Sequence, residues 1–195
     1  MSTDGQTEQA QIRWDDDGLP VSVKFADFYH SRVSALDESH YTYLAPNQLT
    51  QRWAILEQPL FTIGETGFGT GLNFLAAWQL WQQHAPATST LHYVSVEKYP
   101  LALADLQRAL ALWPALAPFA QELQAAYPAC LRQGFHRLSF AQGKVQLTLI
   151  IDDASAGLEQ LRSARHPLFV DASAAIDAWF LDGFTPAKNP QMWSE

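Results

Sequence analysis

Cysteine is almost absent from this chain of 195 residues, which contains only Cys130. A single cysteine cannot form an intramolecular disulfide, and this scarcity is typical of proteins from a reducing cytosol. The six histidines show no H-x-H or H-E-x-x-H spacing, so we expect no metal site. The chain also lacks a G-x-S-x-G element and a P-loop, which excludes α/β-hydrolases and P-loop NTPases.

Positive charge and long apolar runs are scarce as well. The chain has 12 Lys and Arg against 20 Asp and Glu, which gives a formal net charge of −8. A nucleic-acid substrate would therefore require a local basic patch or another domain. No apolar run approaches the roughly 20 residues of a membrane helix, and residues 1–11 have no signal-peptide pattern. We expect a cytoplasmic protein with no membrane partner.

The most informative stretch is residues 61–74, FTIGETGFGTGLNF, in which an apolar run leads to Glu65. Three glycines follow at alternating positions: Gly67, Gly69 and Gly71. The order predicts a strand, a glycine turn and a helix, which is where open α/β sheets bind a ligand. The dinucleotide fingerprint G-x-G-x-x-G requires a third glycine where Leu72 stands, so a nicotinamide oxidoreductase is disfavoured. A glycine-rich loop without a ligand is the remaining alternative.

Two further predicted strands also end on carboxylates. Residues 91–97 end on Glu97, where a carboxylate in nucleoside-binding folds accepts hydrogen bonds from ribose hydroxyls. Residues 145–151 are followed by Asp153, which has the chemistry to accept the exocyclic amine of adenine. Either acid has a structural alternative, because a carboxylate after a strand also caps the next helix.

A fourth predicted strand, buried and spanning residues 175–181, leads into Asp182-Gly183-Phe184-Thr185-Pro186-Ala187-Lys188-Asn189-Pro190. Two prolines and a glycine directly after a strand predict a rigid loop. Asp182 stands at the end of this strand, where its carboxylate could position a substrate. The structural alternative is an aspartate that hydrogen-bonds its own turn.

The remaining chain divides into three predicted parts. Residues 1–10 are expected to be a disordered lead-in, and residues 11–48 a β-hairpin (12–14 with 21–25) followed by a cap segment. Its acidic Asp15–Asp17 run is interpreted as a solvated turn. Residues 49–195 form the core, in which helices are expected over 48–56, 72–83, from Pro100 onward and over 118–127.

Several of these motifs together resemble one family. They are ETGFGTGLNF at 65–74, VEKYPL at 96–101, FLDGFTPAKNPQMW at 180–193 and LDESHYTYL at 36–44. The chain resembles the methyltransferase half of bacterial bifunctional tRNA 5-methylaminomethyl-2-thiouridine biosynthesis proteins. His40 is a departure, since the family pattern has Arg there.

The resemblance implies an α/β, Rossmann-like class I S-adenosylmethionine-dependent methyltransferase sheet with an N-terminal β-hairpin extension. It implies binding of S-adenosylmethionine by Glu65, Gly67, Gly69, Gly71, Glu97 and Asp153. Glu65 would hold the cationic amino-acid end of the cofactor with the turn. Asp182 would be catalytic, and Phe184, Lys188 and Tyr41 would contact the substrate.

The implied reaction is methyl transfer to the aminomethyl group of 5-aminomethyl-2-thiouridine at the tRNA wobble position. Partners would be tRNA and an FAD-dependent oxidoreductase domain, with FAD bound only in that C-terminal domain. The class I strand order is 3-2-1-4-5-7-6, and this chain contains four of those strands, so we expect a partial core and low solubility. Alternatives are a protein or small-molecule acceptor, or a non-catalytic fragment that binds cofactor weakly.

Overall fold

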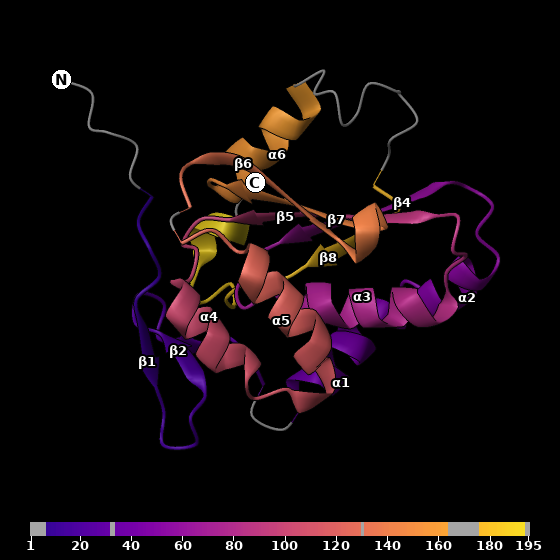
Figure 1. Cartoon of the computed structure of the whole chain (residues 1–195). Coiled ribbons are helices and arrows are strands. Elements are labelled where there is room, and N and C mark those ends of the chain that lie inside the picture. Colours follow the sequence, from indigo (N-terminus) through magenta and orange to yellow (C-terminus); the bar gives the residue numbers. More distant parts are fainter. Residues whose placement is uncertain (1–6, 32–33, 130, 164–175, 194–195) are drawn as a thin grey trace.

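The computed structural model describes residues 7–31, 34–129, 131–163 and 176–193. A five-stranded sheet has helices on both faces, and a small three-stranded sheet lies beside it (Figure 1). The strands of the large sheet are Leu60–Thr66 (β4), Thr90–Glu97 (β5), Gly134–Phe140 (β6), Val145–Ile151 (β7) and Ala178–Leu181 (β8).

The strand order of the large sheet is β6-β7-β5-β4-β8. Strands β7, β5, β4 and β8 are parallel, and β6 pairs antiparallel with β7 at the edge. Along the chain the parallel strands are therefore third, second, first and fourth, which confirms the predicted class I methyltransferase arrangement for its first four strands. Their carboxyl ends meet at one edge, where α/β sheets bind ligands.

The helices form two layers of unequal size (Figure 1). On one face lie α1 (Ala35–Ser39), α2 (Leu49–Ala54), α3 (Leu72–His84), α4 (Leu103–Leu110) and α5 (Ala117–Ala126). The other face carries α6 (Ala154–Ser163), which packs on Val94, Val96 and Ile150. Under the first layer, the rings of Trp53, Phe61 and Trp81 form an edge-to-face cluster with centroids 5.1–6.4 Å apart. Trp53 and Trp81 are both buried.

The predicted hairpin is present as part of a three-stranded antiparallel sheet. Its strands are Ile12–Trp14 (β1), Pro20–Ser22 (β2) and Asp27–Phe28 (β3). Asp15 Oδ1 accepts from the backbone N–H of Asp17 at 3.0 Å and of Leu19 at 2.8 Å, so the acidic run is a hydrogen-bonded turn as expected. The cap segment between β3 and residue 48, for which the sequence shows no clear period, contains α1 and a π-helical turn at His40–Leu44. The helix predicted over residues 48–56 is present as α2.

The start of α4 differs from the prediction, because the helix begins at Leu103 and not at Pro100. Residues 100–102 are extended, and two of their carbonyls accept hydrogen bonds from other elements. The carbonyl of Pro100 accepts from the N–H of Ala10 at 3.1 Å, and the carbonyl of Leu101 from the Tyr127 hydroxyl at 3.1 Å. Those carbonyls are therefore already engaged, and the helix begins after them.

The strand predicted as buried over residues 175–181 is half exposed. Residue 175 lies outside the described residues, and β8 covers Ala178–Leu181 with Trp179 41% and Leu181 60% exposed. Among the described residues, β8 pairs only with β4. Trp179 lies across Gly64 of β4, where a Cβ would come within 2.7 Å of the indole. The apolar sequence predicted the strand, but its position at the edge exposes alternate side chains.

Candidate functional site

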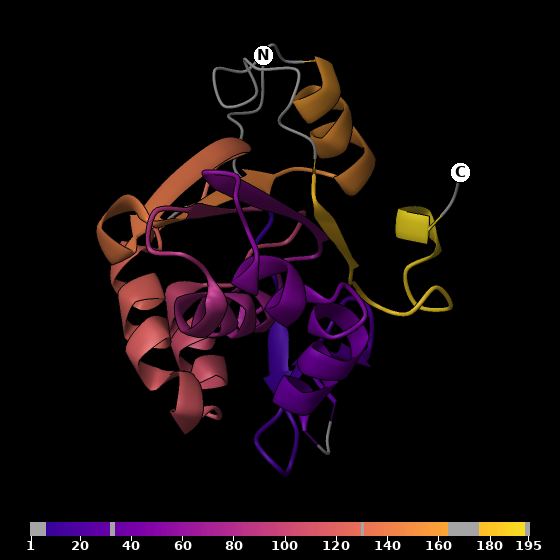
Figure 2. The same ribbon diagram turned by 90° about the vertical axis from the view of Figure 1, so that its right-hand side faces the viewer.

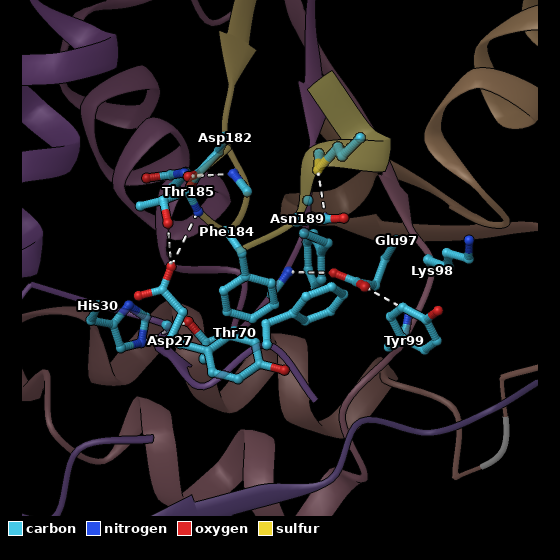
Figure 3. Close-up of a pocket in the computed structure, with 18 of the residues that line it drawn as sticks. Asp27, His30, Thr70, Glu97, Lys98, Tyr99, Asp182, Phe184, Thr185 and Asn189 are labelled. Carbon is cyan, nitrogen blue, oxygen red and sulfur yellow. Dashed lines mark hydrogen bonds between the residues drawn. The ribbon is translucent and has the colours of Figure 1, made fainter. Parts of the chain in front are cut away.

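A cavity of about 480 Å³ lies at the carboxyl ends of the parallel strands (Figure 3). This volume falls within the range of small-molecule sites. Its walls come from the glycine turn, the residues after β5, β7 and β8, the segment around β3, and the α1 region. The cavity therefore occupies the position that the strand order predicts for a ligand.

The glycine turn and the loop after β8 are in direct contact. Gly67 has φ +79°, and a Cβ there would lie 3.1 Å from the carbonyl oxygen of Asp182. The Thr66 hydroxyl donates to the same carbonyl at 2.8 Å. Only glycine combines this backbone conformation with so close an approach. Gly71 (φ +75°) instead begins α3 and packs on the Phe68 ring, where a Cβ would come within 2.8 Å.

Glu97 connects the end of β5 to the glycine turn. Its Oε2 accepts from the N–H of Gly69 at 2.9 Å, and its Oε1 accepts from the N–H of Tyr99 at 2.7 Å. Burial raises the pKa of Glu97 above its usual value, although backbone N–H donors oppose the shift. A carboxylate fixed in this way keeps further acceptor capacity for the hydroxyls of a ligand.

Asn73, in the first turn of α3, bridges two carboxylates. Its Nδ2 donates to Oε1 of Glu65 at 3.0 Å and to Oδ2 of Asp182 at 2.6 Å. Glu65 is 1% exposed, and its Oε2 accepts from the hydroxyl of Ser95 at 2.7 Å. Burial, followed by the nearby charge of Asp182, raises the pKa of Glu65 to about 8. The bridge holds both acids together under the cavity wall.

Asp182 also hydrogen-bonds its own turn, since Oδ1 accepts from the N–H of Gly183 at 2.7 Å. Burial raises the pKa of its carboxyl, while hydrogen bonds from Gly183, Tyr43 and Asn73 oppose the shift. The predicted turn contact and a position in the cavity wall therefore coexist. Asp182 is a carboxylate held by several donors at the mouth of a ligand-sized cavity.

Asp153 caps α6, as one of its two predicted alternatives requires, and it also lines the cavity, while its contact with adenine stays a prediction. Its Oδ1 accepts from the N–H of Ser155 at 3.1 Å, which caps α6. Its Oδ2 lies 3.0 Å from Nζ of Lys98, and this hydrogen bond lowers the pKa of Asp153. Both side chains line the cavity.

The loop after β8, drawn in yellow in Figure 2, is hydrogen-bonded to Asp27 of the N-terminal sheet (Figure 3). Asp27 Oδ2 accepts from both the N–H and the hydroxyl of Thr185, each at 3.1 Å. The ring of Phe184 stacks on Phe25 with centroids 4.7 Å apart and meets the edge of Tyr29 at 5.1 Å. We call these contacts of Asp27, Thr185, Phe25 and Phe184 the loop latch.

The structure brings most of the predicted site residues to one cavity. Six of them line it: Gly67, Gly69, Glu97, Asp153, Asp182 and Phe184. Glu65 and Gly71 are buried behind the wall, and Tyr41 (81% exposed) and Lys188 point to solvent. Phe184 lines the cavity while its ring stacks on Phe25.

Other lining residues carry no distinct signal in the sequence. Asn73 lies inside the glycine motif. The only sign of a role in the sequence is that it is a polar residue at the second position of an otherwise apolar helix. Tyr43 comes from the cap segment after β3, and Asp27 from β3 itself. His30 hydrogen-bonds the hydroxyl of Thr70 at 2.9 Å, and burial lowers its pKa to about 4. These residues reach the cavity through tertiary packing.

The described residues contain neither a metal-binding cluster nor a membrane-spanning helix. None of their His, Cys, Asp and Glu side chains form a group of three or more suited to a metal ion. No helix within the described ranges is long and apolar enough to cross a membrane.

Comparison with known proteins gives a consistent result. Residues 114–195 match a family model described as S-adenosyl-L-methionine-dependent methyltransferase. A solved structure described as MNMC2 from Aquifex aeolicus has a TM-score of 0.65 at 20% identity, and the alignment covers 95% of this chain and 53% of that one. The fold is that of this solved structure, and the matched segment places the chain beside the S-adenosyl-L-methionine-dependent methyltransferases.

The relatives found by sequence similarity belong to a narrower group of proteins. The chain is 53% identical over 188 residues to the tRNA 5-methylaminomethyl-2-thiouridine biosynthesis bifunctional protein MnmC of Pseudomonas aeruginosa (strain UCBPP-PA14). It is 50% identical over 187 residues to the protein of the same name from Methylobacillus flagellatus. Each alignment covers 96% of this chain and 27% of the relative. The chain is similar to these MnmC proteins and spans about a quarter of their length.

Proposed function

We propose that this chain binds S-adenosyl-L-methionine in the cavity and transfers its methyl group to the primary amine of 5-aminomethyl-2-thiouridine at the tRNA wobble position. The observation that carries the proposal is the carboxylate of Asp182, held beside the glycine turn in the wall of a ligand-sized cavity. The names of the relatives, which concern biosynthesis of the methylated nucleoside, support the acceptor.

The residues present fit the cofactor. Gly67 and Gly69 leave the turn without side chains, so a ligand can approach the backbone closely. The carboxylate of Glu97 would accept from the ribose hydroxyls, and Asp153 would accept from the adenine amine. Glu65 is enclosed behind Asn73, so we assign it an indirect role at the amino-acid end of the cofactor.

The chemistry required of the protein is positioning and removal of a proton. When bound, S-adenosyl-L-methionine supplies an electrophilic methyl group on a sulfonium centre. An alkylamine is largely protonated at pH 7, and it must be neutral to attack. Asp182 would orient the ammonium group and accept its proton, and alignment against the glycine turn would supply most of the acceleration. Phe184, Lys188 and Tyr41 would contact the tRNA.

Further partners follow from the family. We propose that the activity belongs to the cytoplasm and operates with an FAD-dependent oxidoreductase domain, which produces the amine. The net charge of −8 disfavours non-specific electrostatic binding of tRNA by this chain alone. The other domain would therefore contribute to tRNA binding.

The test uses tRNA from cells that lack the methylation step. The chain is incubated with this tRNA and methyl-labelled S-adenosyl-L-methionine, and the nucleosides are analysed by mass spectrometry. Label in 5-methylaminomethyl-2-thiouridine supports the proposal. Label in protein or a small molecule would assign another acceptor, and binding of S-adenosylhomocysteine without transfer would indicate a cofactor-binding fragment. Binding of NAD instead would indicate an oxidoreductase.

A further inference from the structure

The carboxylate of Asp182 belongs to a loop, yet the group that holds its Oδ2 belongs to a helix. Asn73 is 9% exposed, and its neighbours Leu72 and Phe74 are buried in the core. Its Nδ2 is 2.6 Å from Oδ2 of Asp182. The donor is therefore fixed by packing of α3, whereas Gly183 and Thr185, on the loop itself, are exposed.

Asn73 is in turn held by Glu65. The two hydrogens of one amide nitrogen are directed to Glu65 Oε1 and Asp182 Oδ2, which fixes the rotation of the amide group. Glu65 is anchored by Ser95 on the adjacent strand β5. A chain of hydrogen bonds thus runs from the centre of the sheet to the carboxylate in the cavity wall, and Glu65 itself does not line the cavity.

We propose that Asn73 is a positioning residue, which acts through Asp182 and, anchored by Glu65, holds the Asp182 carboxylate toward the acceptor amine. This inference rests on the proposed function, because it assigns Asp182 its task. Loss of the amide leaves Asp182 held by its own turn and by Tyr43 only. Misplacement of a reacting group by about 1 Å is enough to reduce turnover by about 100-fold.

The first test compares Asn73→Leu and Asn73→Ala with the wild-type chain. We expect the turnover number to fall about 100-fold while the dissociation constant for S-adenosylhomocysteine stays within a few-fold. Ser89→Ala is the matched control, since it removes a buried hydrogen bond to the carbonyl of Gln58 far from the cavity. In an Asp182→Asn background the Asn73 change should have almost no further effect, because the two residues act as a unit. A full additional loss in that background would overturn the proposal.

The second test does not depend on activity. The titration of the Asp182 carboxyl is followed by carbon NMR in the wild-type chain and in both Asn73 variants. The amide stabilises the charged form, so its removal should shift the titration to higher pH. The other titratable groups that interact with Asp182 are not substituted in these variants; they are Glu38, Tyr43, Glu65, Tyr93 and Glu97. The pKa of Glu65 should rise as well, because Glu65 loses the same amide donor.

The activity test and the titration test distinguish a failure of the proposed function from a failure of the positioning role of Asn73. If the wild-type chain transfers no methyl group to tRNA while the Asp182 titration shifts, the proposed function fails and the Asn73–Asp182 coupling stands. An unshifted titration in folded Asn73 variants overturns the positioning role, whatever the activity. If Asn73→Leu does not fold, Asn73→Ala, which adds no bulk, decides the outcome.

Discussion

Asn73 donates to Asp182 across 2.6 Å, although 109 positions separate the two residues in the chain. The hydrogen bond joins the helix after the glycine turn to the loop after the fourth parallel strand. These are the two stretches in which the sequence concentrates its chemistry. Because both lie at carboxyl ends of adjacent parallel strands, β4 and β8, the fold brings them together. The site therefore depends on this pairing.

Replacement of Asp182 by Asn should abolish most methyl transfer. The amide keeps the shape of the side chain but cannot accept the proton of the ammonium group, so we expect a loss of 10²- to 10⁴-fold in turnover. Affinity for S-adenosylhomocysteine, measured by calorimetry, should change less than a few-fold. Turnover within a few-fold of wild type would show that Asp182 does not accept the proton.

Replacement of Glu97 by Ala should act on cofactor binding. The change removes hydrogen bonds to a charged group, each worth about 1.5–3 kcal/mol, so affinity for S-adenosylhomocysteine should fall by about 10- to 100-fold. It also removes acceptors for Gly69 and Tyr99, so the melting temperature must be measured alongside. Adenine alone is the control ligand, since its affinity should fall much less. An equal loss for both ligands would contradict a contact with ribose.

The buried Glu65 should make stability fall as pH rises. Its pKa is raised from 4.5 to about 8, so between these values the folded state binds a proton that the unfolded state has lost. The stabilisation that the protonated Glu65 contributes is complete below about pH 4.5 and is lost as pH rises to about 8. The free energy of unfolding should fall by at most about 1.4 kcal/mol per pH unit in this range. Urea unfolding of wild type and Glu65→Gln from pH 5 to 8.5 measures the difference. The exposed Glu57→Gln is the control, and parallel pH profiles for all three proteins would refute the effect.

The sequence predicted the parallel strands and the glycine turn because these features are local. Apolar runs that end on Glu65 and Glu97 are expected for strands buried on both faces. The sequence did not reveal the exposure of Trp179, because exposure depends on which strand lies at the edge. It also did not separate Glu65, enclosed behind Asn73, from Glu97, which lines the cavity. That difference arises from Asn73, which lies eight positions further along the chain, in α3.

The loop latch should hold the residues after Asp182 in place. Asp27→Ala removes the acceptor for both hydrogen bonds of Thr185, and at this exposed site we expect a loss of about 0.5–1 kcal/mol. Amide hydrogen exchange over residues 183–189 should become faster, with little change in β4. Asp16→Ala in the hairpin turn is the control. Unchanged exchange in Asp27→Ala would mean that the Phe25–Phe184 stack alone holds the loop.

The exposed edge of the sheet should limit the solubility of this chain, and a charge placed there should relieve the limit. Strand β8 pairs only with β4 within the described ranges, and Leu181 is 60% exposed on it. Unpaired strand edges with apolar side chains associate with one another, and lysine on an edge opposes this association.

Leu181→Lys should therefore raise the monomer fraction in light scattering and size-exclusion chromatography. Ile55→Lys is a matched control, because Ile55 is 80% exposed but lies after α2 and outside any strand. An equal gain from both variants would attribute the effect to net charge alone. A sharp, reversible thermal transition of wild-type monomer would show that the edge does not drive association, since an aggregating chain does not refold on cooling.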